Sequence, residues 1–162
     1  MALLGQGAIA MWWNIEPAWR AEFEDWHTHE HFPERMGIPG FLRGSRWGAA
    51  DGGDGFFVMY ELEAYETVAS PGYLARLNAP TPWSTKMMPH HRDMVRSQCR
   101  VLESCGGALS RHVLTIRLSP AAGLEDRLRA HLGGLARTLA TRAGTAAAHL
   151  LQNQTPKIET TT

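Results

Sequence analysis

The sequence has few cysteines, no excess of charge of either sign and no hydrophobic run long enough to cross a membrane. Cys99 and Cys105 are the two cysteines, and their spacing fits neither a CxxC pair nor a disulfide framework, so we expect reduced thiols in a cytoplasmic protein. The 16 lysines and arginines balance the 16 aspartates and glutamates, and no basic run occurs, which argues against nucleic-acid binding. The apolar N-terminal stretch is interrupted at Glu16 and Pro17 and has no charged leader, which argues against a membrane segment.

Nucleotide-binding motifs are also missing. The glycine-rich segment AADGGDG at residues 49–55 is followed by an apolar run typical of a strand and not by a helix start. It is therefore predicted to be a hairpin loop, since a phosphate-binding loop leads directly into a helix. No Rossmann fingerprint, P-loop or flavin signature occurs elsewhere, so we expect no cofactor.

What the sequence does have is enough apolar material for a core, with 44% hydrophobic residues in a chain of 162. Acidic side chains outnumber basic ones before residue 105, the balance reverses after it, and all six tryptophans lie in the first part. The small-residue stretch CGGALS at 105–110 marks the change. We predict a first α+β unit over residues 1–107, a partial second unit over 108–153 and a tail over 154–162.

The first unit is predicted to run strand, helix, strand, strand, helices, strand. Ser70-Pro71 and Thr81-Pro82 are each typical of a helix cap followed by proline at the first helical position, which predicts two short helices. In FLRGSRWG, Phe41, Arg43, Ser45 and Trp47 should share one face if the strand alternates regularly. The predicted strands cover residues 6–15, 41–48, 56–63 and 91–104.

The second unit is predicted to contain a strand at RHVLTIRLS (111–119), a leucine-striped helix over 124–139 and a strand at AAAHLLQ (146–152). This order repeats only the opening of the first unit, so the second copy is incomplete. A sheet with open edges needs a partner strand. We therefore expect a homodimer, or a further segment of chain that completes the fold.

Three histidines stand close together in WHTHEHFPERMGIPGF at residues 26–41. His27 and His31 continue the four-residue repeat of Trp19 and Phe23, so both should face the apolar side of a helix, whereas His29 should face solvent. A buried imidazole is kept neutral and can accept a proton, with a pKa near 6.5 or lower. The alternative is that both imidazoles are simply satisfied by backbone carbonyls at a helix end.

The runs WHTHEHFPERMGIPGFLRGSRW, YELE, YLARLNAPTPW and MVRSQCRV resemble the EthD-like branch of the dimeric α+β barrel superfamily. The resemblance implies a ferredoxin-like antiparallel sheet with helices on one face, which pairs with a second sheet to close a barrel. It also implies a ligand cavity between sheet and helices. The superfamily includes cofactor-independent monooxygenases, cyclases, isomerases and dehydrating enzymes, so the reaction stays open.

The match is sharpest at the EH-Pro-Arg part of this motif, which makes His31 the main catalytic candidate and His27 its assistant. Five further residues are candidates for substrate binding, although each has an ordinary packing or ion-pair alternative: Trp26, Tyr60, His90, Arg96 and Arg100. Of the pair His90 and His91, the second is expected to be solvated.

We expect an enzyme that acts on a small apolar or aromatic carbonyl compound by histidine-mediated proton transfer, as an isomerase, cyclase, lyase or oxygenase. The alternative is a non-catalytic protein that binds a small molecule. A third interpretation is a zinc hydrolase, because HTHEH matches H-x-x-E-H with His27, Glu30 and His31. Against a zinc hydrolase, Pro33 should end the helix and no third ligand is evident on a second helix. A weaker metal site of His27, His31 and the distant His90 stays open as an alternative.

Overall fold

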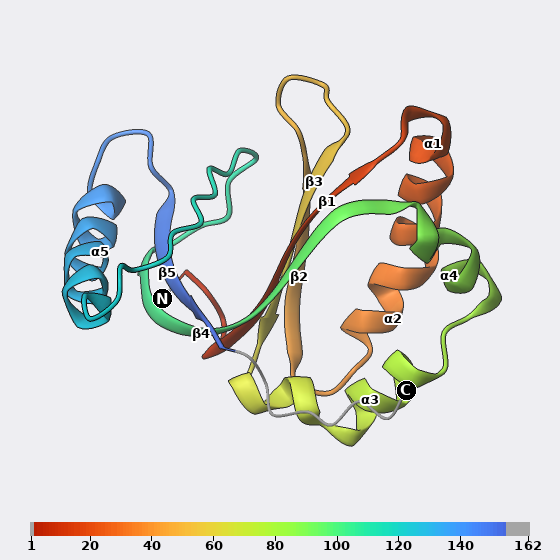
Figure 1. Ribbon diagram of the computed structural model, residues 1–162, viewed down its shortest axis with the longest axis horizontal. Helices are drawn as coiled ribbons and strands as arrows, with labels where there is room; N and C mark the ends of the chain where they lie inside the picture. Colours follow the sequence, from red (N-terminus) through yellow and green to blue (C-terminus); the bar gives the residue numbers. More distant parts are fainter. Residues whose placement is uncertain (1, 155–162) are drawn as a thin grey trace.

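One antiparallel sheet of five strands organises the structure, a computed structural model that describes residues 2–154 (Figure 1). The strand order is β2-β3-β1-β4-β5, and every neighbouring pair is antiparallel. The strands are β1 (Gly7–Ile15), β2 (Phe41–Gly48), β3 (Gly55–Leu62), β4 (His91–Gly106) and β5 (Ala147–Asn153). The order of the first four strands is that of a ferredoxin-like fold, and the predicted α+β class is confirmed.

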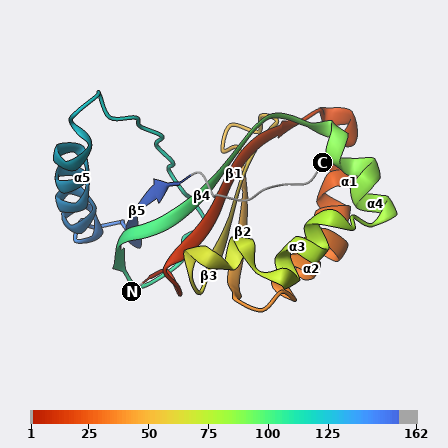
Figure 2. The same ribbon diagram turned by 60° about the horizontal axis from the view of Figure 1, so that its bottom comes forward.

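The helices fall into two groups (Figure 2). The group on one face of the sheet is α1 (Pro17–Trp26), the π-turn η1 (His27–His31), α2 (Phe32–Met36), the 3₁₀ turn η2 (Tyr65–Ala69), α3 (Pro71–Asn78), α4 (Pro82–Met87) and the 3₁₀ turn η3 (Met88–His90). Helix α5 (Glu125–Ala140) lies apart from these, against β5 and the end of β4. None of the helices in residues 2–154 is long and apolar enough to cross a membrane.

The two short helices α3 and α4 begin as the sequence predicts. The Ser70 hydroxyl accepts a hydrogen bond from the backbone N–H of Tyr73, and the Thr81 hydroxyl accepts one from the N–H of Ser84. A proline follows each cap and supplies the backbone angle that a first helical residue needs. Each helix therefore starts where its cap and proline stand, and together they lead the chain to the start of β4.

The sheet has an apolar core on each face. The larger core, beneath the helices, contains Ile9, Trp13, Phe23, Trp26 and Tyr60 among its fully buried members. The smaller core, on the opposite face, is built around four buried residues, Leu3, Ala8, Met59 and Cys99. The central strand β1 therefore contributes Ile9 and Trp13 to the face beneath the helices and Ala8 to the other face, as period-two alternation requires.

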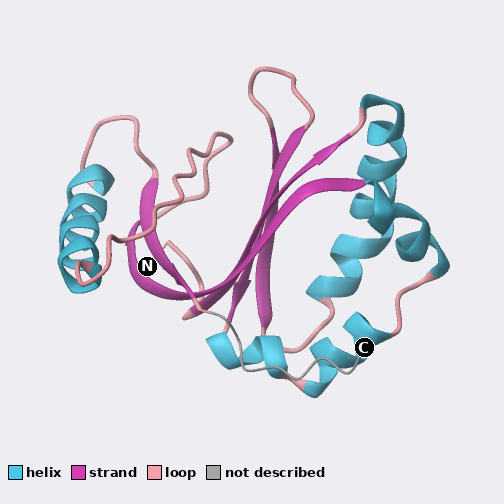
Figure 3. Ribbon diagram, viewed as in Figure 1, coloured by secondary structure: helices cyan, strands magenta, loops and turns pink. Residues whose placement is uncertain are grey.

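The predicted strand over residues 111–119 is wrong. This segment crosses the face opposite the helices without forming a ladder, and the indole N–H of Trp12 donates to the Thr115 hydroxyl at 2.9 Å (Figure 3). Its apolar side chains point outward, with Leu114 84% and Ile116 70% exposed. The segment has the alternation of apolar and polar residues that is typical of a strand, but no strand in residues 2–154 pairs with it.

A bulge changes the direction of one predicted strand residue in β2. The pairing of β2 with β3 gains one residue between Phe41 and Arg43. Phe41 consequently packs in the core beneath the helices, whereas Trp47 packs against the opposite core. The prediction that these residues share one face is therefore wrong for Phe41, because a bulge reverses the alternation at that point.

Gly44 sets how closely the helical layer approaches β2. A Cβ atom at this position would overlap the ring of Phe32, which follows the π-turn. The missing side chain lets the ring lie directly on the strand. This close contact holds the end of η1 against the sheet.

Candidate functional site

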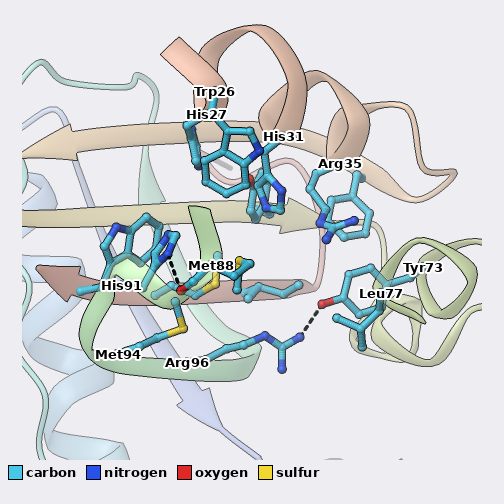
Figure 4. Close-up of a pocket in the computed structure, with 15 residues that line it drawn as sticks. Trp26, His27, His31, Arg35, Tyr73, Leu77, Met88, His91, Met94 and Arg96 are labelled. Atoms are coloured by element: carbon cyan, nitrogen blue, oxygen red, sulfur yellow. Dashed lines mark hydrogen bonds between the residues drawn. The ribbon is translucent and has the colours of Figure 1, made fainter. Parts of the chain in front are cut away.

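A cavity of about 130 Å³ lies between the sheet and the helical layer (Figure 4). Its walls carry the polar side chains of His27, His31, Arg35, Tyr60, Tyr73, His91 and Arg96. Ile9, Met11, Trp13, Trp26 and Phe41 supply much of its apolar lining. The location between sheet and helices is the one that the family resemblance implied.

The histidine motif does not end a helix but widens it. Residues His27–His31 form a π-turn, and the N–H of Phe32 donates to the carbonyl of His27, five residues earlier. The chain then continues as α2 through Pro33 to Met36, so the predicted helix end at Pro33 is wrong. Proline is tolerated because it falls in the first turn of α2, where the loss of one N–H costs little.

The π-turn directs two of the three histidines inward. The rings of His27 and His31 lie 5.6 Å apart, and both line the cavity. His29 faces the other way, as predicted, with a side chain 70% exposed and its Nδ1 2.8 Å from a carboxylate oxygen of Asp25. The three histidines of the motif are therefore in two different environments.

Burial keeps both inward imidazoles neutral. Burial, together with the nearby His31 and Arg46, lowers the pKa of His27 to about 2. Burial likewise lowers the pKa of His31 to about 3, with Arg35 contributing. Neither Nδ1 atom has a hydrogen-bond partner among residues 2–154, so no other group in that range fixes which nitrogen holds the proton.

The expected companions Trp26 and Tyr60 also line the cavity. The indole of Trp26 lies against His31, with ring centroids 4.6 Å apart, and its N–H donates to the Ser84 hydroxyl at 3.3 Å. Tyr60 is 1% exposed, and burial raises the pKa of its hydroxyl. The hydroxyl is therefore a proton donor and has no partner of its own in the described part of the chain.

His91 lines the cavity and His90 does not, which reverses the expectation from the sequence. His90 stacks on Trp19 outside the cavity, with ring centroids 3.7 Å apart. His91 is held by its Nδ1, which donates to the carbonyl of Met88 at 3.1 Å, so its Nε2 is left as an acceptor. Burial lowers the pKa of His91. The sequence pattern also did not single out Arg35 and Tyr73, which line the same cavity.

A bulge in β4 explains the reversal. Met94 and Arg96 face the cavity, so strict alternation would direct His90 inward as well. One extra residue beside Asp93, whose φ is 52°, shifts the pairing of β4 with β1 and reverses the alternation. The bulge thereby turns His91 inward. Asp93 adopts a positive φ that glycine favours, so the sequence itself gives only a weak signal for the bulge.

Arg96 and Arg100, both candidates for substrate binding, lie in different environments. Arg96 lines the cavity and donates to the Tyr73 hydroxyl at 2.5 Å. Arg100 is outside the cavity and forms an ion pair with Glu66 at 2.6 Å and a hydrogen bond to Gln154. The ion-pair alternative therefore describes Arg100, and Arg96 is the one that can contact a ligand.

The glutamate of the zinc-protease interpretation, Glu30, is engaged outside the cavity. Glu30 accepts a hydrogen bond from Thr81, the residue that caps α4, and does not line the cavity with His27 and His31. Within residues 2–154, no group of three or more histidine, cysteine, aspartate or glutamate side chains is placed to hold a metal ion. The glutamate thus has a structural role in joining α4 to η1.

We expect the free energy of unfolding to fall as the pH is lowered from 7 to 5. In the unfolded chain both imidazoles titrate near 6.5, whereas the folded pKa is about 2 for His27 and about 3 for His31. The unfolded state therefore binds protons first, and each group destabilises the fold by roughly 1.4 kcal/mol per pH unit below 6.5. Urea denaturation at several pH values measures this. His31→Gln should lessen the pH dependence and His29→Gln should not; equal slopes in all three proteins would refute burial of neutral imidazoles.

Comparisons with known proteins add little beyond the geometry. No family model and no curated protein matches this chain. Among solved structures, it is similar to a variant of SnoaB, a cofactor-independent oxygenase from Streptomyces nogalater, with 16% sequence identity and a TM-score of 0.44. The alignment covers 57% of this chain and 89% of that one. The ferredoxin-like assignment rests on the strand order of this chain itself.

Proposed function

We propose that the protein is a cofactor-independent enzyme that transfers a proton next to a carbonyl group of a small apolar or aromatic molecule. The observation that carries this proposal is that one cavity is lined both by the neutral imidazole of His31 and by the hydrogen-bond donors Tyr60 and Arg35. The neutral imidazole of His31 can take a proton from carbon, and the electron pair left behind moves to the carbonyl oxygen. Its lowered pKa makes it a weak base until a bound ligand with negative charge raises that pKa toward the working pH. The Tyr60 hydroxyl and the Arg35 guanidinium can then stabilise the enolate oxygen by hydrogen bonds.

The walls of the cavity suggest how the proton returns. His31 stands on the helical wall, whereas His91 stands on the sheet wall with its acceptor nitrogen fixed by Met88 (Figure 4). A proton taken by one imidazole and delivered to another carbon gives an isomerase, and loss of a leaving group from the enolate gives a lyase. The imidazole of His27 lies beside that of His31, with ring centroids 5.6 Å apart, and in this proposal it assists His31. The choice between isomerase, lyase, cyclase and oxygenase chemistry depends on the substrate.

A second candidate function is binding without chemistry. His27 and His31 are packed among aromatic rings and have no polar partner in residues 2–154 that would orient them for proton transfer. Oriented bases usually have such a partner. This observation favours a protein that holds a small molecule, and it keeps the binding interpretation as the alternative.

Deuterium exchange distinguishes the two functions. The purified protein is incubated in heavy water with a panel of ring-containing ketones, lactones and organic acids, and the products are analysed by mass spectrometry. We expect at least one compound to gain carbon-bound deuterium or to be converted with the wild-type protein and not with the His27→Ala/His31→Ala double variant. Retention of a compound by the wild-type protein, with no exchange in any member of the panel, would support binding instead.

We further propose that the protein is a homodimer that uses the sheet face opposite the helices. That face carries the half-buried rings of Trp47 and Phe57, stacked 5.5 Å apart, and the crossing segment leaves Leu114 and Ile116 exposed. A second copy would cover these apolar side chains, and the β2 edge of the sheet has no partner strand among the described residues. We expect sedimentation to show a dimer, and charged substitutions at Leu114 and Ile116 to dissociate it. A wild-type monomer at micromolar concentration would contradict the assembly.

Membership of the EthD-like branch, the cytoplasmic location and the division into units at residue 107 stay predictions. In the structure, β4 of the first predicted unit pairs directly with β5 of the second. The two parts therefore share one sheet.

A further inference from the structure

The polar side chains around the cavity lack partners to an unusual degree. Five buried polar atoms on its lining residues form no hydrogen bond within residues 2–154: Trp13 Nε1, His27 Nδ1, His31 Nδ1, Arg35 Nη1 and Tyr60 Oη. Arg46 Nη1 is the one other such side-chain atom in that range. Buried polar groups in native proteins are nearly always paired. The concentration of unpaired atoms in one place indicates a ligand that would pair with them.

These unpaired atoms are complementary to a ligand that is rich in hydrogen-bond acceptors. An indole and a guanidinium can only donate, and a tyrosine hydroxyl with a raised pKa also donates. The cavity lining contains two arginines, Arg35 and Arg96, but no aspartate or glutamate. The nearest carboxylate of Arg35 is Glu34 at 3.7 Å, and Glu34 is shared with Arg76 at the same distance. The cavity is therefore short of both acceptors and negative charge.

The size and the rim of the cavity limit the ligand further. A cavity of about 130 Å³ is close to the roughly 150 Å³ that accommodates a benzene molecule in a protein interior. Three partly exposed apolar residues lie at its edge, Leu77, Met88 and Met94, with 41%, 44% and 39% of their surface exposed. Methionine side chains adapt their shape readily, so this rim can enclose an apolar substituent. The enclosed part of the ligand should be a single ring.

We infer that the ligand is a ring-sized organic anion whose oxygen atoms accept hydrogen bonds from Tyr60 and Arg35, with the ring held between Trp26 and the sheet. The inference rests on the proposed function in using the same cavity, and it narrows the substrate from carbonyl compounds to organic acids. The charge of the surroundings fits this class. The charged and titratable groups that face the cavity are His27 and His31 from η1, Arg35 from α2, Tyr60 from β3, Tyr73 from α3, and His91 and Arg96 from β4. Arg46 from β2 does not line the cavity but is close enough to His27 and Tyr60 to add positive charge behind them.

An anion in this position changes the ionisation of its neighbours. All of the facing groups are neutral or positive at neutral pH, so nothing among them repels the ligand. Negative charge beside an imidazole favours its protonated form, which raises the pKa of His31 from its lowered value. Binding should therefore become tighter as the pH falls toward 5.

The test is a binding comparison at pH 7 between three single-ring probes of equal size: benzoate, benzamide and benzamidinium. We expect benzoate to bind at least about tenfold more tightly than the neutral amide, and the cation not to bind, by isothermal titration calorimetry. The larger 2-naphthoate should bind more weakly than benzoate.

Variants assign the preference to this cavity. Arg35→Gln should remove the advantage of benzoate over benzamide, and Tyr60→Phe should reduce it by several-fold if Arg35→Gln fails to fold. Arg100→Gln is the matched control, because Arg100 is paired with Glu66 outside the cavity, and it should change neither affinity. Equal binding of benzoate and benzamide, no benzoate binding up to about 10 mM, or a benzoate preference that persists in both cavity variants would overturn the inference.

These outcomes are separate from those for the proposed reaction. A preference for anions without deuterium exchange would support the anionic ligand and contradict the proposed enzymatic activity. Exchange into a neutral ketone, together with equal affinities for benzoate and benzamide, would contradict the anionic ligand and support the proposed enzymatic activity. The binding probes need no turnover.

Discussion

His31→Ala should reduce turnover by roughly 10² to 10⁴-fold, which is the usual contribution of a positioned general acid or base. The substitution removes the imidazole that faces the cavity from the π-turn, while the apolar walls and Tyr60 stay in place. Substrate affinity should therefore change little, so that kcat falls and KM does not. The measurement is steady-state kinetics on the compound that gains deuterium in the exchange experiment.

His29→Ala is the matched control for this variant. His29 belongs to the same π-turn but faces solvent and pairs with Asp25, so its removal should leave kcat unchanged. His27→Ala should have an intermediate effect if His27 assists His31. Equal losses in the His29 and His31 variants, or full activity of His31→Ala, would show that the histidines have no role in proton transfer.

The second large effect should be on stability. Trp26 is fully buried, lies against His31 and Phe23, and donates to Ser84, so Trp26→Ala leaves a large cavity and an unpaired hydroxyl. Substitutions of this kind cost about 3–5 kcal/mol of unfolding free energy. Urea denaturation followed by circular dichroism measures the loss, which a chain of ordinary stability would barely survive.

Trp83→Ala tests whether the loss is specific to the buried indole. Trp83 is only half-buried at the surface of the same core, and its N–H reaches the partly exposed Glu22 at 3.3 Å. It should therefore cost less than half as much. If the two variants were equally stable, the packing of Trp26 beneath the π-turn would be wrong.

The parts of the fold that the sequence predicts are those controlled by local chemistry. Ser70 and Thr81 each supply a cap next to a proline, and both helices begin there. The inward side of His27 and His31 follows from a four-residue repeat that tolerates either an α-turn or a π-turn. The opposite exposure of His29 follows from the same repeat.

Three of the errors come from a single extra residue. A bulge beside Asp93 turns His91 inward, a bulge in β2 turns Phe41 inward, and the π-turn carries the helix through Pro33. Each inserts one residue into a regular repeat, and nothing in the local composition marks the insertion. Such features lie next to the cavity, where they re-aim side chains that a regular strand or helix would direct elsewhere.

The chemistry of the cavity depends on contacts between distant parts of the chain. Arg96 and Arg100 look equivalent in the sequence, but Glu66 in η2 engages only Arg100. The shortage of acceptors near Tyr60 and Arg35 likewise becomes visible only when the elements that line the cavity are brought together. Residue types alone suggested a site, and three-dimensional pairing decides which of its members are available to a ligand.

The most direct test of the central claim is a crystal structure of the protein with the compound that undergoes deuterium exchange. The account predicts the ring inside the cavity between η1 and the sheet, with an oxygen atom hydrogen-bonded to Tyr60 or Arg35 and the exchanging carbon next to the imidazole of His31. Density for the compound on the opposite face, in the groove between Trp12, Trp47 and Thr115, with the cavity unoccupied, would contradict it.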